Sequence, residues 1–194
     1  GHPNFSANLQ YVERAVKFLL WQRGGYKIYI GGSQRIGEHI RKCYAADGAR
    51  KFDHHFMGQQ VYEHEFEVVS CAVDEVPASF EAGKLLGRNL QGNRIGFDLG
   101  ASDRKVSAVV DGTPIYSEEV IWEPRKHSDP GYHYNEVVQS LKTAASKLPR
   151  VDAIGGSSAG IYVDNRPMVA SLFRGIPFEQ FDEIKNMFLR IKNE

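Results

Sequence analysis

The chain opens with apolar residues at the three- and four-residue spacing of an amphipathic helix. This helix is predicted to begin after Asn8, whose side chain can cap it, and to end at the glycine pair 24–25. A short β-rich run, 26–30, predicts a strand, and the next helical pattern covers 36–44. The apolar positions of the first helix are Leu9, Val12, Val16, Leu19 and Leu20.

The pattern changes in the next stretch of the chain. Residues 52–67 are aromatic and rich in histidine, and the alternation over 61–69 predicts a strand. Residues 75–93 are expected to form a helical stretch followed by a linker punctuated by glycines. The sequence therefore predicts an N-terminal α/β segment, 1–93, ahead of a second domain, 94–194.

The second domain begins with three strands in close succession. The strands 94–98 and 105–110 are followed by the turn Asp111–Gly112, which returns the chain into a third strand, 115–121. Short connections of this kind predict a three-stranded antiparallel meander.

Helices and one further strand follow the meander. Apolar spacing over 137–148 predicts a helix, and 151–154 predicts a strand; a strand that follows a helix indicates a parallel crossover. A last amphipathic helix is expected over 178–191. The predicted fold class is α/β, with a mixed sheet built from a three-stranded meander followed by a helix–strand–helix unit, and an added N-terminal α/β segment.

Composition narrows the classes of function. The 194 residues are 42% apolar, enough for a core, and 24 basic residues balance 24 acidic ones, which argues against a nucleic-acid or membrane-surface partner. No apolar run reaches the roughly 18 residues that span a bilayer, and no secretory signal is recognised, so a cytoplasmic protein is expected. The two cysteines, Cys43 and Cys71, form no CxxC pair, which argues against structural zinc and redox motifs.

The most informative stretch is 95–105, where an acidic residue ends an apolar strand before a tight turn. Asp98 can hold magnesium through water, and Gly100 can let backbone N–H groups approach phosphate oxygens. Ser102 offers a hydroxyl, while Lys105 or Arg104 can offset phosphate charge. The alternative interpretation is a plain hairpin turn with a solvated aspartate. No Walker A or GxGxxG motif is present.

A second group of small residues follows the strand near 151. Ligands of open α/β sheets bind at the carboxyl ends of the strands, where a backbone with few side chains can approach them. The alternatives are tight packing for the glycines and ordinary turn chemistry for the Asp-Asn pair. The candidate substrate-binding residues are Gly156, Ser157, Ser158, Gly160, Asp164 and Asn165.

These two stretches carry a resemblance to known families. Residues 98–102, Asp-Leu-Gly-Ala-Ser, resemble the first phosphate motif of the actin-like superfamily of sugar kinases, actin and heat-shock ATPases. Residues 155–164 resemble the glycine-rich loop of the ROK family (repressors, open reading frames and sugar kinases). The resemblance implies an actin-like, ribonuclease H-like domain that binds ATP and Mg²⁺. It places the nucleotide phosphates at Asp98, Gly100, Ala101, Ser102 and Lys105, with the magnesium ion at Asp98.

The resemblance also implies a reaction, with one departure. Its members transfer a phosphoryl group from ATP to a sugar hydroxyl, with a catalytic aspartate on a strand after the helix that 178–191 resembles, and the chain printed here ends at Glu194. The expectation is therefore a sugar-kinase-like protein, acting on a sugar or phosphosugar, whose catalytic base is not visible, so whether it is an enzyme stays open. The alternative is a regulatory module that senses nucleotide or sugar without turnover.

The N-terminal segment has a resemblance of its own. The strand 27–30, followed by Gly31, Gly32 and a helix, is similar to the part of actin-like ATPases that contacts adenosine. Here it precedes the phosphate motif, so a nucleotide cleft would require a circular permutation, a homodimer or a missing C-terminal lobe. A simple capping unit is the alternative.

Two further patterns suggest other chemistry. His54, His55 and His64 are not expected to bind metal, because adjacent histidines on a strand point to opposite faces and no three-ligand spacing is present. Residues 156–160 formally match GxSxG with Ser158 as nucleophile, which makes a serine hydrolase a lesser alternative. Against it, the apolar residues that follow resemble a strand rather than the required helix.

Overall fold

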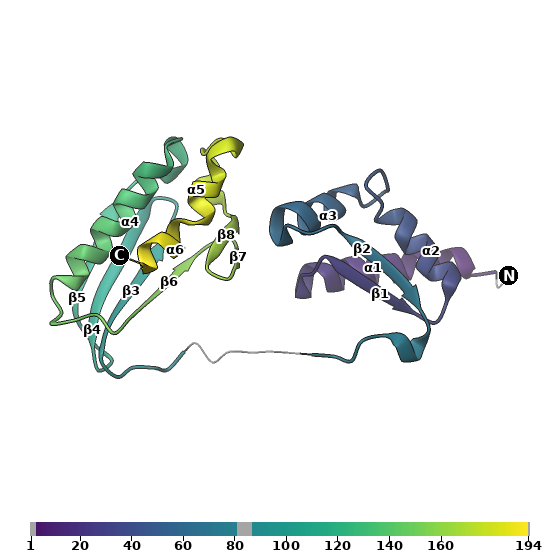
Figure 1. Cartoon of the computed structure of the whole chain (residues 1–194), viewed down its shortest axis with the longest axis horizontal. Helices are drawn as coiled ribbons and strands as arrows, with labels where there is room; N and C mark the ends of the chain where they lie inside the picture. Colours follow the sequence, from purple (N-terminus) through teal and green to yellow (C-terminus); the bar gives the residue numbers. More distant parts are fainter. Residues whose placement is uncertain (1–2, 81–86, 194) are drawn as a thin grey trace. The chain divides into compact units, whose positions relative to one another are not determined.

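The computed structural model describes residues 3–80 and 87–193, which belong to two units along the chain (Figure 1). The first unit is Gly1–Gly83 and the second is Lys84–Glu194. Among the described residues, no helix has both the length and the apolar character that crossing a membrane requires.

The first unit pairs two parallel strands with helices. Strand β1 runs beside β2 in parallel, from the pair Lys27 and Glu67 to the pair Gly31 and Cys71, and α2 packs on both strands. The side chain of Ser33 caps α2 by accepting a hydrogen bond from the backbone N–H of Ile36, at 3.4 Å. The elements are α1 (Phe5–Arg23), β1 (Lys27–Gly31), α2 (Gln34–Cys43), α3 (Lys51–His55), a π-helical segment (Phe56–Tyr62), β2 (Glu67–Cys71) and a 3₁₀ turn (Val73–Glu75).

The strand predicted over 61–69 is wrong in its first half. Val61 lies inside the π-helical segment, which ends at Tyr62, and is buried; the chain then reverses at Glu63, whose φ is 56°. The apparent alternation spans this turn. The helix expected from residue 75 is also wrong where the structure describes it, because the 3₁₀ turn ends at Glu75; residues 81–86 of that prediction lie outside the described part.

The second unit confirms the predicted mixed α/β sheet. The strand order is β5-β4-β3-β6; β3, β4 and β5 are antiparallel neighbours, while β6 returns through α4 to lie parallel to β3 (Figure 1). A separate hairpin, β7–β8, follows. The elements are β3 (Asn93–Leu99), β4 (Asp103–Val110), β5 (Thr113–Ile121), a 3₁₀ turn (Pro124–Lys126), α4 (Pro130–Ala145), β6 (Ala153–Ser158), β7 (Ile161–Val163), β8 (Arg166–Val169) and a 3₁₀ turn (Ser171–Phe173).

One face of this sheet carries the core of the unit. Helix α4 packs on β3 and β4, and the buried apolar residues of these elements form one cluster with others further along the chain. Asp129 caps α4 by accepting a hydrogen bond from the N–H of Gly131 at 2.9 Å. The cluster includes Ile95, Leu99, Val106, Ala108, Val137, Leu141, Ala144, Phe173, Ile184 and Met187.

The last predicted helix, 178–191, is interrupted. It consists of a 3₁₀ turn (Phe178–Gln180), α5 (Phe181–Lys185) and α6 (Met187–Lys192), with Asn186 between the two helices. The side-chain amide of Asn186 donates to the carbonyl of Asp182 at 2.9 Å and so competes with the backbone of the helix. The apolar periodicity still holds, because Ile184 and Met187 both reach the core.

Candidate functional site

A row of polar side chains crosses all four strands of the second unit's sheet. The pairing register places Ser157 of β6 beside Asp98 of β3, Asp98 beside Lys105 of β4, and Lys105 beside Glu119 of β5. Paired positions on neighbouring strands point to the same face, so these four side chains share the face opposite α4. Asp98 and Ser157 stand at the carboxyl ends of two parallel strands, the place where open α/β sheets bind ligands.

The next row on the same face has only small side chains and leaves the backbone open. It consists of Gly155, Gly96, Ser107 and Ser117, in the same strand order. A Cβ built at Gly96 or Gly155 would meet no atom within 4 Å, and the hydroxyls of Ser107 and Ser117 lie 2.7 Å apart. The backbone beside Asp98 is therefore accessible to a ligand that lies flat on the sheet.

Charges alternate along the polar row. The hydroxyl of Ser157 donates to Oδ1 of Asp98. Lys105 Nζ donates to Asp103 Oδ1 at 2.7 Å and lies 3.8 Å from Glu119 Oε1. The hydrogen bond from Lys105, with a smaller one from Ser102, holds the pKa of Asp103 below its usual value, and the same bond raises the pKa of Lys105. The row thus presents one ammonium group between carboxylates.

The predicted phosphate motif forms the tight β3–β4 hairpin. The N–H of Gly100 donates to the carbonyl of Asp103 at 2.9 Å, and the carbonyl of Gly100 accepts from the indole N–H of Trp122 at 2.9 Å. A Cβ at this glycine would lie 2.8 Å from the Asp103 oxygen. Ala101 and Ser102 are exposed at the tip, and the Ser102 hydroxyl donates to Asp103 Oδ2 at 3.0 Å. Donors expected to face a phosphate therefore hold a carboxylate in this structure.

Arg104 lies on the opposite face from the row. Its buried guanidinium donates to Glu136 Oε2 of α4 at 3.0 and 2.7 Å, and to the hydroxyl of Ser140. These two hydrogen bonds to one carboxylate oxygen tie β4 to α4. Of the two basic residues suggested for offsetting phosphate charge, only Lys105 shares the face with Asp98.

Three of the small residues after 155 have close neighbours of their own: Gly156 and Ser158 on the helix face of β6, and Gly160 beside the end of β8. A methyl group at Gly156 would overlap the ring of Phe97, and a Cβ at Gly160, whose φ is 151°, would lie 2.6 Å from the carbonyl of Val169. Ser158 Oγ is buried and has no hydrogen-bond partner among the described residues. Within residues 87–193, no histidine contacts Ser158, and strand β7 follows β6 where a nucleophile elbow would require a helix. This geometry does not favour the serine hydrolase.

Asp164 and Asn165 form the two-residue turn of the β7–β8 hairpin. Their φ values of 50° and 62° are typical of a type I′ turn, in which aspartate and asparagine are common. Both side chains are exposed. No hydrogen bond or ion pair within residues 87–193 joins them to Asp98, so the structure supports the turn interpretation for this pair.

Gly31 and Gly32 lie in the first unit, at the carboxyl end of β1. The strand, the glycine pair and the N-terminus of α2 follow one another as the sequence predicts. Gly32 has a φ of 99°, a conformation that other residues rarely adopt. These two glycines belong to a different unit from Asp98.

The histidines of the first unit serve other contacts. His54 and His55 lie on helix α3, so the predicted reason for excluding metal, opposite faces of a strand, is wrong. His54 Nδ1 lies 2.8 Å from the carbonyl of Tyr44, and the ring of His64 stacks on Tyr26 with centroids 4.3 Å apart.

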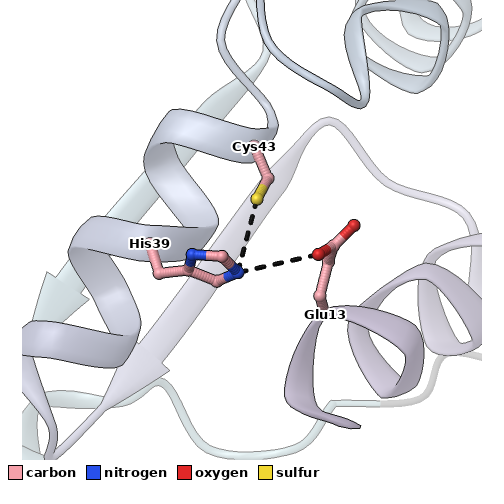
Figure 2. Close-up of side chains that lie close together, drawn as sticks. All are labelled: Glu13, His39 and Cys43. Carbon is pink, nitrogen blue, oxygen red and sulfur yellow. Dashed lines mark hydrogen bonds and ion pairs between the residues drawn. The ribbon is translucent and has the colours of Figure 1, made fainter. Parts of the chain in front are cut away.

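Three possible metal ligands meet elsewhere, between α1 and α2 (Figure 2). His39 Nε2 lies 3.5 Å from Cys43 Sγ and 3.6 Å from Glu13 Oε2. Arg50 Nε donates to the other carboxylate oxygen of Glu13 at 2.9 Å. Sequence reasoning missed this group: the four-residue spacing of His39 and Cys43 on one helix was the available signal, but Glu13 comes from another helix.

A comparison of the chain with protein-family models and with curated proteins finds no match. The functional argument therefore rests on the geometry of the open face. That face combines a carboxylate, an ammonium group, hydroxyls and accessible backbone at the carboxyl ends of parallel strands.

Proposed function

We propose that the second unit binds the phosphates of ATP with a magnesium ion on the open face of its sheet, as part of a sugar-kinase-like protein of the actin-like type. The observation that carries the proposal is the register of Asp98 beside Ser157 on parallel strands, with Lys105 on the other side of Asp98. The strand and helix order of this unit, a meander, a helix and a parallel strand, is also the one that the ROK resemblance implies.

The residues present suit magnesium bound through water. Magnesium prefers oxygen ligands, keeps several waters and uses one or two carboxylates. One oxygen of Asp98 accepts from Ser157, which orients the carboxylate, and its Oδ2 has no hydrogen-bond partner in the described part of the chain. That oxygen can accept a hydrogen bond from a magnesium-bound water.

The same face offers room and charge for phosphates. Gly96 and Gly155 leave the sheet backbone bare beside Asp98, so a phosphate group can approach closely. Lys105 and Ser102 now hold the exposed carboxylate of Asp103. The triphosphate of a nucleoside triphosphate carries more negative charge than a carboxylate. It can therefore replace Asp103 as the acceptor for Lys105 and Ser102, since exposed ion pairs contribute little stability.

The bound magnesium would help neutralise the charge that develops during phosphoryl transfer to a sugar hydroxyl. The protein would hold the phosphates in place, and a general base typically adds 10²–10⁴-fold. Two other carboxylates lie near Lys105: Asp103, which accepts its hydrogen bond, and Glu119 of the row, so both are engaged with the ammonium group. This observation favours the second candidate, a module that senses nucleotide or sugar without turnover.

Calorimetric titration of the chain with ATP and Mg²⁺ tests the phosphate site. We expect Asp98→Asn to weaken Mg²⁺-dependent ATP binding by more than about tenfold, a loss of about 1.4 kcal/mol. The matched control is Glu118→Gln, because Glu118 lies in the same sheet on the opposite face. This control should leave the affinity unchanged.

A second variant tests the open floor independently of charge. We expect Gly155→Val to keep the fold, since no atom stands within 4 Å of a Cβ there, and to weaken ATP binding by occluding the backbone. Absence of ATP binding to the unmodified chain would reject the site. So would an affinity in both site variants that is unchanged from that of the unmodified chain. ADP formation with a panel of sugars and phosphosugars separates the kinase from the sensor.

A further inference from the structure

The group formed by Glu13, His39 and Cys43 lies in the first unit, apart from the proposed phosphate site. His39 and Cys43 extend from successive turns of α2, and Glu13 faces them from α1 (Figure 2). Their three potential ligand atoms all lie within 4.8 Å of one another. Cys43 is 8% exposed, while the side chains of Glu13 and His39 are 18% and 30% exposed, so the group is covered on one side and reached by solvent on the other.

The contacts converge on one ring nitrogen. Both Cys43 Sγ and Glu13 Oε2 approach Nε2 of His39, as the two dashed lines in Figure 2 show. A cysteine–histidine–acid catalytic relay needs the nucleophile on one ring nitrogen and the acid on the other, which this arrangement does not provide. Three ligand atoms that face a common point are instead the arrangement of a metal site.

The two separations from His39 match tetrahedral zinc coordination, and the third pair of ligand atoms lies within 4.8 Å. Zinc bonds of about 2.3 Å to sulfur and 2.0–2.2 Å to nitrogen or oxygen place tetrahedral ligand atoms about 3.4–3.6 Å apart. The observed distances from His39 Nε2 are 3.5 Å to sulfur and 3.6 Å to oxygen. We propose that Glu13, His39 and Cys43 bind a zinc ion, with water as the fourth ligand on the exposed side.

The ligand chemistry selects this kind of metal. A thiolate and an imidazole favour zinc over magnesium or calcium, which prefer oxygen ligands. Arg50 holds Oε1 of Glu13, so Oε2 stays directed at His39 and binds as a single-oxygen ligand. Binding converts the Cys43 thiol to a thiolate and releases that proton to solvent, with His39 binding as the neutral imidazole.

Cobalt and zinc titrations of the metal-free chain, residues 1–194, test the site. Cobalt reports a thiolate ligand by a near-ultraviolet charge-transfer band and tetrahedral geometry by strong visible absorption. We expect one equivalent of Co²⁺ to produce both signals and one equivalent of Zn²⁺ to abolish them. Zinc affinity is then measured by competition with a chromophoric chelator.

Variants of the ligands are compared with a matched cysteine control. Cys43→Ser should remove the charge-transfer band, while Cys71→Ser should keep it, because Cys43 and Cys71 are the two cysteines of the chain. His39→Gln, at a partly exposed position, tests the site without opening the core. We expect His39→Gln and Glu13→Gln each to weaken zinc binding by at least about tenfold. Replacing a residue that only supports a ligand already weakens metal binding by about tenfold or more, so replacing a ligand should weaken it at least as much.

Three results would overturn the zinc site. The first is an unmodified chain that gives no thiolate band with Co²⁺ and binds Zn²⁺ no more tightly than Cys43→Ser does. The second is a folded His39→Gln variant, judged by the fluorescence of Trp21, that keeps the full zinc affinity. The third is a band that is lost in Cys71→Ser and kept in Cys43→Ser.

Discussion

Two adjacent glycines of β6, Gly155 and Gly156, differ in what surrounds their side-chain positions. Gly156 faces the ring of Phe97 on the helix side, whereas Gly155 faces open space on the other side. We expect Gly156→Ala to destabilise the second unit by about 1–3 kcal/mol, because the added methyl collides with the ring of Phe97 and displaces it from its packing against the core. Urea unfolding followed by Trp122 fluorescence measures this loss.

Gly155→Ala is the matched control for this overpacking. It makes the same chemical change one residue earlier, and alanine is favoured over glycine inside a strand by about 0.5–1 kcal/mol. The control should therefore be neutral or slightly stabilising. An equal loss of stability in both variants would contradict the packing role of Gly156.

The same alternation explains which site residues the sequence could place. The sequence identifies Asp98 and Ser157 as candidates in two separate stretches of the chain, and the β3–β6 register brings them into contact. It also groups Ser157 with Ser158, but successive strand residues point to opposite faces, so Ser158 is buried on the helix side. Which face a residue occupies depends on strand bounds that local pattern does not define.

At the scale of elements, one ion pair joins strand β4 to helix α4. The side chain of Arg104 is 6% exposed and that of its partner Glu136 is 31% exposed. We expect Glu136→Ala to cost about 3 kcal/mol, because it leaves the buried guanidinium without a counter-charge. Arg104→Met should lower the stability less, by about 1–2 kcal/mol. The carboxylate of Glu136 is then solvated by water, and the buried hydroxyl of Ser140 loses its hydrogen bond from Arg104.

Combining the two changes gives the control for this prediction. With the guanidinium already replaced, Glu136→Ala should add little, so the double variant is expected to be more stable than Glu136→Ala alone. Chemical denaturation of the four proteins measures this cycle. Additive losses would show that the two residues act separately.

Elements were predicted well where burial and local pattern agree. The meander and the helix after it follow from strand alternation, the Asp111–Gly112 turn and the apolar spacing over 137–148. The strand over 61–69 was wrong because its apparent alternation spans a chain reversal at Glu63. The last helix was missed in detail because the bond from the Asn186 side chain competes with helix backbone bonds.

At the scale of the whole chain, each unit contains one tryptophan. Trp21 belongs to the first unit and Trp122 to the second, and they are the two tryptophans of the sequence. Since contacts are concentrated within each unit, we expect two separate unfolding transitions. Trp122→Phe reports the first unit alone and Trp21→Phe the second.

Two perturbations should then act on one transition each. Zinc should raise the denaturation midpoint reported by Trp21 and leave the midpoint reported by Trp122 unchanged. Gly156→Ala should lower the midpoint reported by Trp122 and leave the midpoint reported by Trp21 unchanged. Coincident transitions that shift together under both changes would contradict independent units.

The sequence by itself determined the α/β class, the order of the meander, the helix and the parallel strand in the second unit, and the acidic residue at the end of β3, because these follow from local periodicity and turn chemistry. Only the tertiary structure decided which side chains meet. It placed Asp98 between Ser157 and Lys105, turned Arg104 toward α4, and assembled Glu13 with His39 and Cys43. Strand register and helix packing set these distances, and both depend on contacts between segments far apart in the chain.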